Sequence, residues 1–275
     1  MTGNLFVQEY VDTRKGLGAI LAVYVVAQVV LWAAIAAGIP FLTGFLTALS
    51  GLLMVALPIG ALSYLAWNYW QSMYGKRGYF TFSIPVRGRV LYAVKVGYAA
   101  LVTTGSWVLT AVSIPALITA SAVGLREPVS QAFAFVMDQI PPQVPGWIFV
   151  GIACLILLQS YGLIIAGAAI MSIGAQGKYN SLGFGAPVIG AIIYYVSVQV
   201  INVITILIVP LGIGLAGPEA GKLVPRGMAG ELLGTLETGA EPSVLGLGSF
   251  IAAIFIAAGM WVWAVNAIEK HTSLR

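Results

Sequence analysis

The residue types that most often do chemistry are few in this sequence and stand far apart. The chain of 275 residues contains a single histidine, His271, and a single cysteine, Cys154. Metal sites and nucleophilic triads need several such residues, and the His-Glu-x-x-His run of a metalloprotease is absent from the sequence. One cysteine also forms no internal disulfide. We therefore expect no catalytic residue and no metal in this chain.

Nucleotide hydrolysis is not expected either. A P-loop ends in Gly-Lys-Ser/Thr, whereas the Gly-Lys pairs of this chain are followed by Arg77, Tyr179 and Leu223. None of the nine acidic residues falls in the middle of an apolar segment, which argues against a proton-coupled carrier. The chain is predicted to carry no cofactor of its own.

Two sets of polar residues recur at helical spacing inside apolar segments. Tyr195, Gln199 and Asn202 are spaced i, i+4 and i+7, and Tyr24 and Gln28 are spaced i and i+4. Each set therefore lies on one face of a helix. Two interpretations stay open: hydrogen bonds between packed helices, or the lining of a translocation path.

The elements that carry these residues are membrane spans. The chain is 60% hydrophobic and 8% charged, far below the ~25% charged residues of a soluble domain. Hydropathy and loop breakers predict an all-α integral membrane protein with six transmembrane helices in a single domain, residues 1–275. The predicted spans are 16–38, 41–71, 88–121, 147–173, 186–216 and 246–268. Pro115, Pro187 and Pro210 are expected to break or kink helices.

Basic residues are distributed unequally over the predicted loops. With the N-terminus in the cytoplasm, ten Lys and Arg residues lie inside and three outside, Arg126, Lys222 and Arg226. This asymmetry follows the positive-inside rule and predicts an inner-membrane protein with both termini in the cytoplasm. Topology thus accounts for the net charge of +4, and nucleic acid is not an expected partner.

Two segments outside the spans have predicted structure. Residues 1–15 place apolar and polar side chains on opposite sides of a helical wheel, so we expect an amphipathic helix along the inner membrane surface, with a disordered tail as the alternative. Its apolar side holds Phe6, Val7, Tyr10 and Val11, and its polar side Glu9, Asp12 and Thr13. Residues 217–245 are polar, form an external insertion and contain a helical pattern at Gly230–Glu237.

The loop between the second and third spans combines basic and aromatic residues. Tyr79, Phe80 and Phe82 stand beside Lys76, Arg77, Arg87 and Arg89. Ser83 and Pro85 suit the cap and first turn of a helix. Three aromatic side chains favour insertion into a protein partner, although interfacial anchoring, expected of Trp67, Tyr69 and Trp70, is the alternative. Lys95 lies deeper and is expected to extend to the membrane surface.

This loop resembles that of ABC-2 type permeases, in which a YGxxGYxTxxLPV run and a downstream lysine connect spans 2 and 3. Ile84 replaces the leucine, and eight residues match: Tyr74, Gly75, Gly78, Tyr79, Thr81, Pro85, Val86 and Lys95. The resemblance covers about two dozen residues; the amphipathic N-terminal helix, six spans and large insertion also fit the family more loosely.

The resemblance implies the permease subunit of an ATP-driven exporter with the type V fold. Such a subunit pairs with a second permease and with two ATP-binding subunits, which carry the ATP and Mg²⁺. The segment Tyr79–Arg89 would contain the coupling helix that docks on the ATPase, with Pro85, Arg87 and Arg89 in it. The scarcity of charge within the spans favours an apolar or amphiphilic cargo, such as a drug, a peptide or a lipid-like compound.

Two other classes of protein remain as alternatives. A membrane scaffold or assembly factor would bind a partner through the same loop without moving a substrate. A membrane-embedded enzyme is disfavoured because the acidic, His and Cys constellations of an active site are missing.

Overall fold

The computed structural model describes residues 2–39, 41–75, 77–140, 145–215, 219, 221–239 and 242–270. His271 and three charges of the predicted asymmetry, Lys76, Glu241 and Arg275, lie outside the described residues. The chain divides into two compact units, Met1–Ile140 and Pro141–Leu274. The expectation that they act as one permease domain stays a prediction.

Six helices of the described residues are long and apolar enough to cross a membrane, which confirms the predicted number of spans. Large apolar side chains such as Val23, Leu52 and Ile192 point outward and are more than half exposed. A helix satisfies its backbone hydrogen bonds internally, as hydrocarbon requires. The six are α1 (Thr2–Ala36), α2 (Leu42–Met73), α4 (Gly88–Leu125), α6 (Trp147–Gly174), α7 (Gly185–Ile208) and α9 (Gly248–Lys270).

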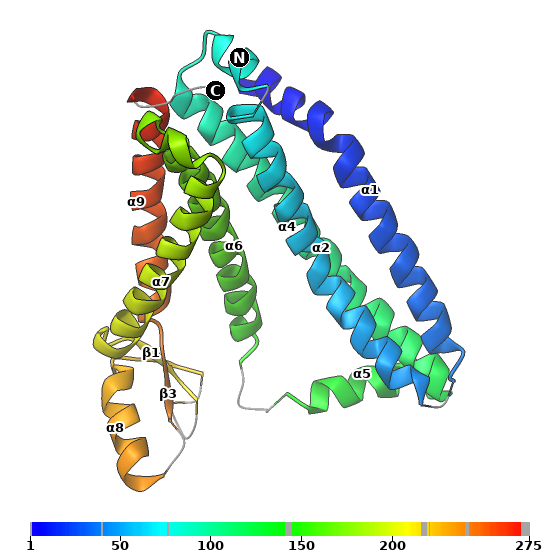
Figure 1. The fold of residues 1–275 in the computed structure, drawn as a ribbon. Coiled ribbons are helices and arrows are strands. Elements are labelled where there is room, and N and C mark those ends of the chain that lie inside the picture. Colours follow the sequence, from blue (N-terminus) through cyan, green and yellow to red (C-terminus); the bar gives the residue numbers. More distant parts are fainter. Residues whose placement is uncertain are drawn as a thin grey trace. The chain divides into compact units, whose positions relative to one another are not determined.

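In the first unit, α1, α2 and α4 pack against one another and run side by side (Figure 1). The end of α1 approaches α4 so closely that a Cβ atom on Gly124 would lie 2.2 Å from the carbonyl oxygen of Ile35. Gly38 then turns the chain with a φ of +65°, a conformation that glycine adopts without steric cost. Only glycine fits both positions without movement of the backbone.

The N-terminal segment differs from the sequence prediction. Residues 2–15 are the first turns of α1 and continue into the first span without a break. Thr13, predicted on the solvent side, is fully buried, whereas Val7 and Tyr10 are 61% and 56% exposed. The polar side of this segment faces protein because Glu9 and Thr13 have partners on α4. The segment is therefore a continuation of the first span and not a separate helix; its position at the membrane surface stays a prediction.

The third predicted span extends further than expected. Pro115 lies inside α4 without ending it, and the helix continues to Leu125, where Arg126 terminates it with a φ of +58°. Next comes α5 (Val129–Asp138), which the sequence prediction missed because a ten-residue helix is too short to span a membrane.

The second unit contains α6, α7 and α9 with a short 3₁₀ helix, η1 (Gly177–Leu182), between α6 and α7. Pro187 occupies the first turn of α7, where proline is tolerated, and Pro210 follows its end. The fifth span ends at Ile208, not 216, because the backbone becomes extended at Val209. The two prolines therefore limit α7 to 24 residues.

The described residues are mostly helical, as predicted for an all-α membrane protein, and a small antiparallel sheet follows α7. The strands are β1 (Gly212–Gly214), β2 (Leu223–Val224) and β3 (Val244–Gly246), in the order β2-β1-β3. The helical pattern at 230–237 is confirmed by α8 (Met228–Thr238). The insertion is thus a folded element between two spans, drawn in yellow and orange in Figure 1.

One carboxylate fastens α8 to the start of β3 and predicts a pH dependence. Glu231 Oε2 accepts hydrogen bonds from the hydroxyl and backbone N–H of Ser243, at 2.7 and 3.0 Å. These bonds, with a smaller effect of Arg226, hold the pKa of Glu231 below its ordinary value of 4.5. The stabilisation is therefore present above that value and is lost as pH falls through the lowered pKa.

We expect the protection of backbone amides at 242–247 from hydrogen exchange to fall as pH falls through the lowered pKa of Glu231. The rates are compared with the intrinsic exchange rate at each pH. Glu231→Gln should exchange rapidly at neutral pH and lack that acid-induced fall in protection. Glu127→Gln, a change at an exposed acid in the other unit, should leave the profile of 242–247 unaltered. An unchanged profile in Glu231→Gln would show that this carboxylate does not hold the segment.

Candidate functional site

The chain between α2 and α4 forms a separate short helix, α3 (Gly78–Ser83). It coincides with the aromatic part of the predicted loop. The prediction that Ser83 and Pro85 begin the next helix is wrong: Ser83 is the last residue of α3, and α4 starts at Gly88. The Ser83 hydroxyl donates to the Phe80 carbonyl at 2.8 Å and so bonds within its own helix.

Side chains on the inner side of α3 hold it against the end of α2. The Thr81 hydroxyl lies 2.7 Å from the Ser72 carbonyl and 3.3 Å from that of Arg77. The half-buried Phe82 ring lies 6.4 Å from the ring of Tyr74, which is buried and also contacts Trp70. Phe82 is therefore directed into the protein.

The other aromatic residues of α3 point outward. Tyr79 is 57% exposed and Phe80 is 69% exposed. Pro85, Arg87 and Arg89 are exposed as well. The structure thus divides the predicted aromatic trio: Tyr79 and Phe80 are available to a partner, and Phe82 anchors the helix that presents them.

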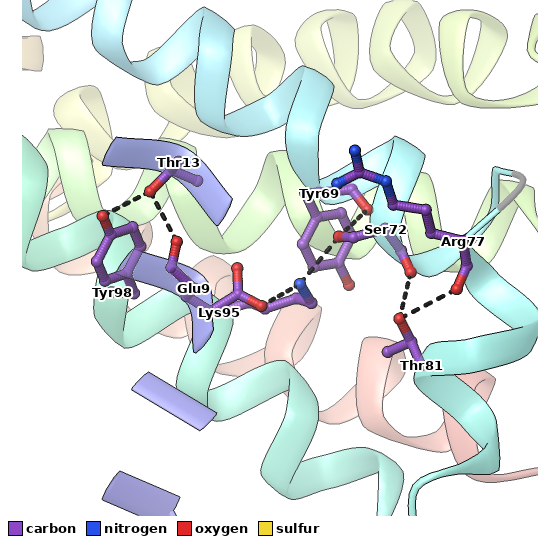
Figure 2. A network of polar contacts seen from close by, with 8 residues as sticks. All are labelled: Glu9, Thr13, Tyr69, Ser72, Arg77, Thr81, Lys95 and Tyr98. Atoms are coloured by element: carbon purple, nitrogen blue, oxygen red, sulfur yellow. Dashed lines mark hydrogen bonds and ion pairs between the residues drawn. The ribbon is translucent and has the colours of Figure 1, made fainter. Parts of the chain in front are cut away.

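A buried ion pair is connected to this helix through Ser72 (Figure 2). Lys95 on α4 pairs with the carboxylate of Glu9 on α1 and donates to the Ser72 hydroxyl at 2.9 Å. The lysine and glutamate side chains are 6% and 14% exposed. Ser72 in turn donates to the Tyr69 carbonyl at 3.2 Å. Lys95 does not extend to the surface as predicted, because its charge is compensated inside the protein.

A second set of contacts fastens α1 to α4 one turn further along. The Thr13 hydroxyl bonds to the hydroxyl of Tyr98 at 2.7 Å and to the carbonyl of Glu9 at 2.8 Å. The rings of Phe6 and Tyr98 pack edge to face, with centroids 6.5 Å apart. The Glu9–Lys95 ion pair, the bond from Lys95 to Ser72 and the bond from Thr81 to Ser72 connect α1, α4, α2 and α3. We call these four residues the polar network.

Tyr69 was expected at the membrane interface with Trp67 and Trp70. It is buried instead, 6.2 Å from the ring of Tyr74. Trp67 is 58% exposed and suits an interfacial position. Trp70 packs on Tyr74 at 5.6 Å, so two of the three aromatic residues support the end of α2.

The polar residues proposed for a translocation path lie in different units. In the first unit, Tyr24 bonds to the Ser113 hydroxyl at 2.7 Å, and Gln28 exchanges two hydrogen bonds with Ser50. Both side chains are buried, so their polar atoms join α1 to α4 and α2. In the second unit, Tyr195 and Gln199 on α7 are exposed and Asn202 is half-buried.

The residues of α3 and of the polar network can contact a partner and join helices by hydrogen bonds and an ion pair. Among the described residues, no group of three or more His, Cys, Asp or Glu side chains is placed to hold a metal. In the polar network, Lys95 pairs with Glu9 and donates to the Ser72 hydroxyl, and the Thr81 hydroxyl donates to the Ser72 backbone carbonyl. Through Thr81 and Ser72, α3 is connected to Lys95 on α4, and Lys95 is connected to Glu9 on α1.

Comparisons with family models, with curated proteins and with solved structures found no match to this chain.

Proposed function

We propose that this chain is the membrane-spanning permease subunit of an ATP-driven exporter and that α3 is its coupling helix. The observation that carries the proposal is the exposed pair Tyr79 and Phe80 on a six-residue helix. Aromatic side chains that project from a fixed helix are typical anchors of a protein interface. The outward side of α3 can contact a partner while its inner side is held against the end of α2.

The resemblance to ABC-2 permeases supports this reading through the residues that carry it. Of the matching residues, Thr81 and Lys95 both bond to Ser72, and Tyr74 packs against Phe82. They are separated in sequence and adjacent in space. Their contacts hold α3 against the end of α2 and connect that end to α4.

In this proposal ATP and Mg²⁺ bind to two separate ATPase subunits, and a second permease completes the path. The cargo is apolar or amphiphilic, because charged residues are scarce within the spans. The protein lies in the inner membrane with both termini and α3 in the cytoplasm. Tyr195, Gln199 and Asn202, which α7 presents on an accessible face, are the better candidates for contact with cargo.

Co-purification tests the assignment most directly. An ATPase subunit recovered in about equal amount, together with ATP-dependent transport in vesicles, is the expected outcome. Recovery of the chain alone, or with a partner that lacks ATPase activity, would instead favour a membrane scaffold.

Orientation is tested by single cysteines placed on η1, before α7, and on β2, after it. Lys178 and Leu223 are exposed, and α7 is roughly 36 Å long, enough to cross about 30 Å of hydrocarbon. In a Cys154→Ala background, Lys178→Cys should react with an impermeant thiol reagent from the cytoplasmic side and Leu223→Cys from the opposite side. The background change is needed because Cys154 is exposed. Labelling of both from one side would refute the six-span topology.

A further inference from the structure

The second unit contains an apolar groove of about 450 Å³ between α6, η1, α7 and α9. This volume falls within the ~300–1,000 Å³ range of small-molecule sites. Side chains from all four elements line it, among them Ile173, Tyr179, Ile193, Met260 and Trp263. The lining is almost wholly apolar, so its occupant must contribute hydrocarbon over most of its length.

The dimensions of the groove fit one hydrocarbon chain. Along α7 the lining runs from Ala186 to Ile201, a distance of roughly 22 Å at 1.5 Å per residue. Spread over this length, the volume leaves a long and narrow space, which matches the shape of an extended hydrocarbon chain.

One end of the groove carries positive charge. The Lys178 ammonium lies 4.8 Å from the centroid of the Tyr179 ring, and that ring lines the groove. Lys178 itself is exposed on η1. Trp263, which also lines the groove, is half-exposed, and Tyr and Trp are enriched where hydrocarbon meets headgroups. The groove therefore combines an apolar channel with a cationic, aromatic mouth.

We propose that this groove binds an anionic phospholipid, with one acyl chain along α7 and the headgroup, which carries a net negative charge, beside Lys178. The charge complementarity at η1 selects an anionic headgroup over a zwitterionic one. The site lies within one unit of the protein and does not depend on the exporter assignment. An occupied groove would also cover the apolar faces that α7 and α9 leave between them.

Gly259 offers a way to fill the groove without disturbing the fold. It lines the groove, and a Cβ atom built on it meets no atom within 4 Å. Gly259→Leu therefore places a side chain in the space of the acyl chain. Gly167→Leu on α6 is the matched control, because its Cβ position is equally open and it lies outside the groove lining.

The test uses phosphatidylglycerol with a photoreactive acyl chain, and phosphatidylcholine with the same chain, in nanodiscs that contain the purified full chain. Adducts mapped by mass spectrometry should concentrate on Ile189, Ile193 and Met260. Val196 and Val200, which are exposed on α7 outside the lining, should be labelled weakly. Phosphatidylglycerol should label the groove more strongly than phosphatidylcholine does.

Gly259→Leu should lower groove labelling by about tenfold because overpacking excludes the chain, and Gly167→Leu should not. Lys178→Gln should lower labelling by phosphatidylglycerol by roughly fivefold, the attraction of one lysine to an anionic headgroup, and leave phosphatidylcholine unchanged. If Gly259→Leu proves not to fold, Ile193→Trp fills the same groove from α7.

Four results would overturn the proposal. Labelling spread evenly over Val196, Val200 and the groove would show that lipid contacts this surface without a specific site. Equal labelling by both lipids, or no effect of Lys178→Gln, would show that Lys178 does not bind an anionic headgroup. Groove residues protected from both lipids and cross-linked to a second copy of the chain would identify a protein occupant.

Discussion

Replacing Lys95 with Met is expected to lower the free energy of unfolding by about 3–5 kcal/mol, the usual cost of leaving the partner of a buried ion pair without compensation. Glu9 would lose its counter-ion at a site where its side chain is only 14% exposed. The substitution would also remove the hydrogen bond from Lys95 to Ser72. The first unit, Met1–Ile140, should be the part that melts earlier.

The matched control is Arg89→Met, on the same helix. Arg89 is exposed, and the described residues show no ion pair at it. Its replacement removes the same charge without creating a buried one, so stability should change by no more than about 0.5 kcal/mol. Equilibrium unfolding in mixed micelles, followed by tryptophan fluorescence, measures both variants.

The double variant Glu9→Gln, Lys95→Met separates the ion pair from simple packing. With neither charge present, the unpaired-charge penalty disappears and part of the lost stability should return. A coupling free energy of about 0.5–3 kcal/mol between the two positions is expected. Additive effects of the two single changes would mean that the residues are adjacent without stabilising each other.

Sequence alone predicted the membrane helices well, because hydropathy is a local property that a window of about 19 residues captures. The same reasoning extended the fifth span beyond Val209, since Leu211 and Ile213 are as apolar as the residues before them. The structure uses them in and beside strand β1, where backbone pairing with β3 decides their conformation. Hydropathy carries no information about such pairing.

The candidate site was predicted in part, and the part that was missed is non-local. The aromatic residues of α3 stand together in the sequence and were identified there. Glu9 and Lys95 are 86 positions apart, and neither residue indicates the other in a single sequence. One signal was available: opposite charges near the same predicted end of two spans are expected to pair, because a lone buried charge is costly.

The direction of each aromatic side chain on α3 also required the structure. Tyr79, Phe80 and Phe82 are similar in chemistry and nearly consecutive, so composition treats them alike. The helix separates them, because Thr81 and Phe82 face α2 and Tyr74, and Tyr79 and Phe80 face away. The experiment that tests docking should therefore change Tyr79 and Phe80 together and keep Phe82.

Replacing Tyr79 and Phe80 with Ala together is expected to uncouple transport from ATP hydrolysis. Each aromatic anchor in a desolvated interface is worth about 2 kcal/mol or more, so the pair should weaken binding of the ATPase by roughly a thousandfold. Both side chains are more than half exposed, and their loss should hardly change the stability of the permease itself. Docking and folding can thus be separated at these positions.

Two comparison variants make the result specific. Phe82→Ala removes a ring that packs on Tyr74 and should destabilise the unit more than it weakens docking through direct contact. Arg87→Ala with Arg89→Ala removes exposed charges whose effect on binding is screened at physiological salt. Their effect on ATPase recovery should therefore appear mainly at low ionic strength.

The measurement is reconstitution of each variant with the candidate ATPase, followed by complex recovery and transport. Monodispersity in detergent establishes that the permease is folded before either is compared with the parent. If the Tyr79→Ala, Phe80→Ala variant is folded, retains its ATPase and transports at the parental rate, α3 is not the coupling element. The exporter assignment would then lose the observation that carries it, because the exposed aromatic pair would have no partner in the transport cycle.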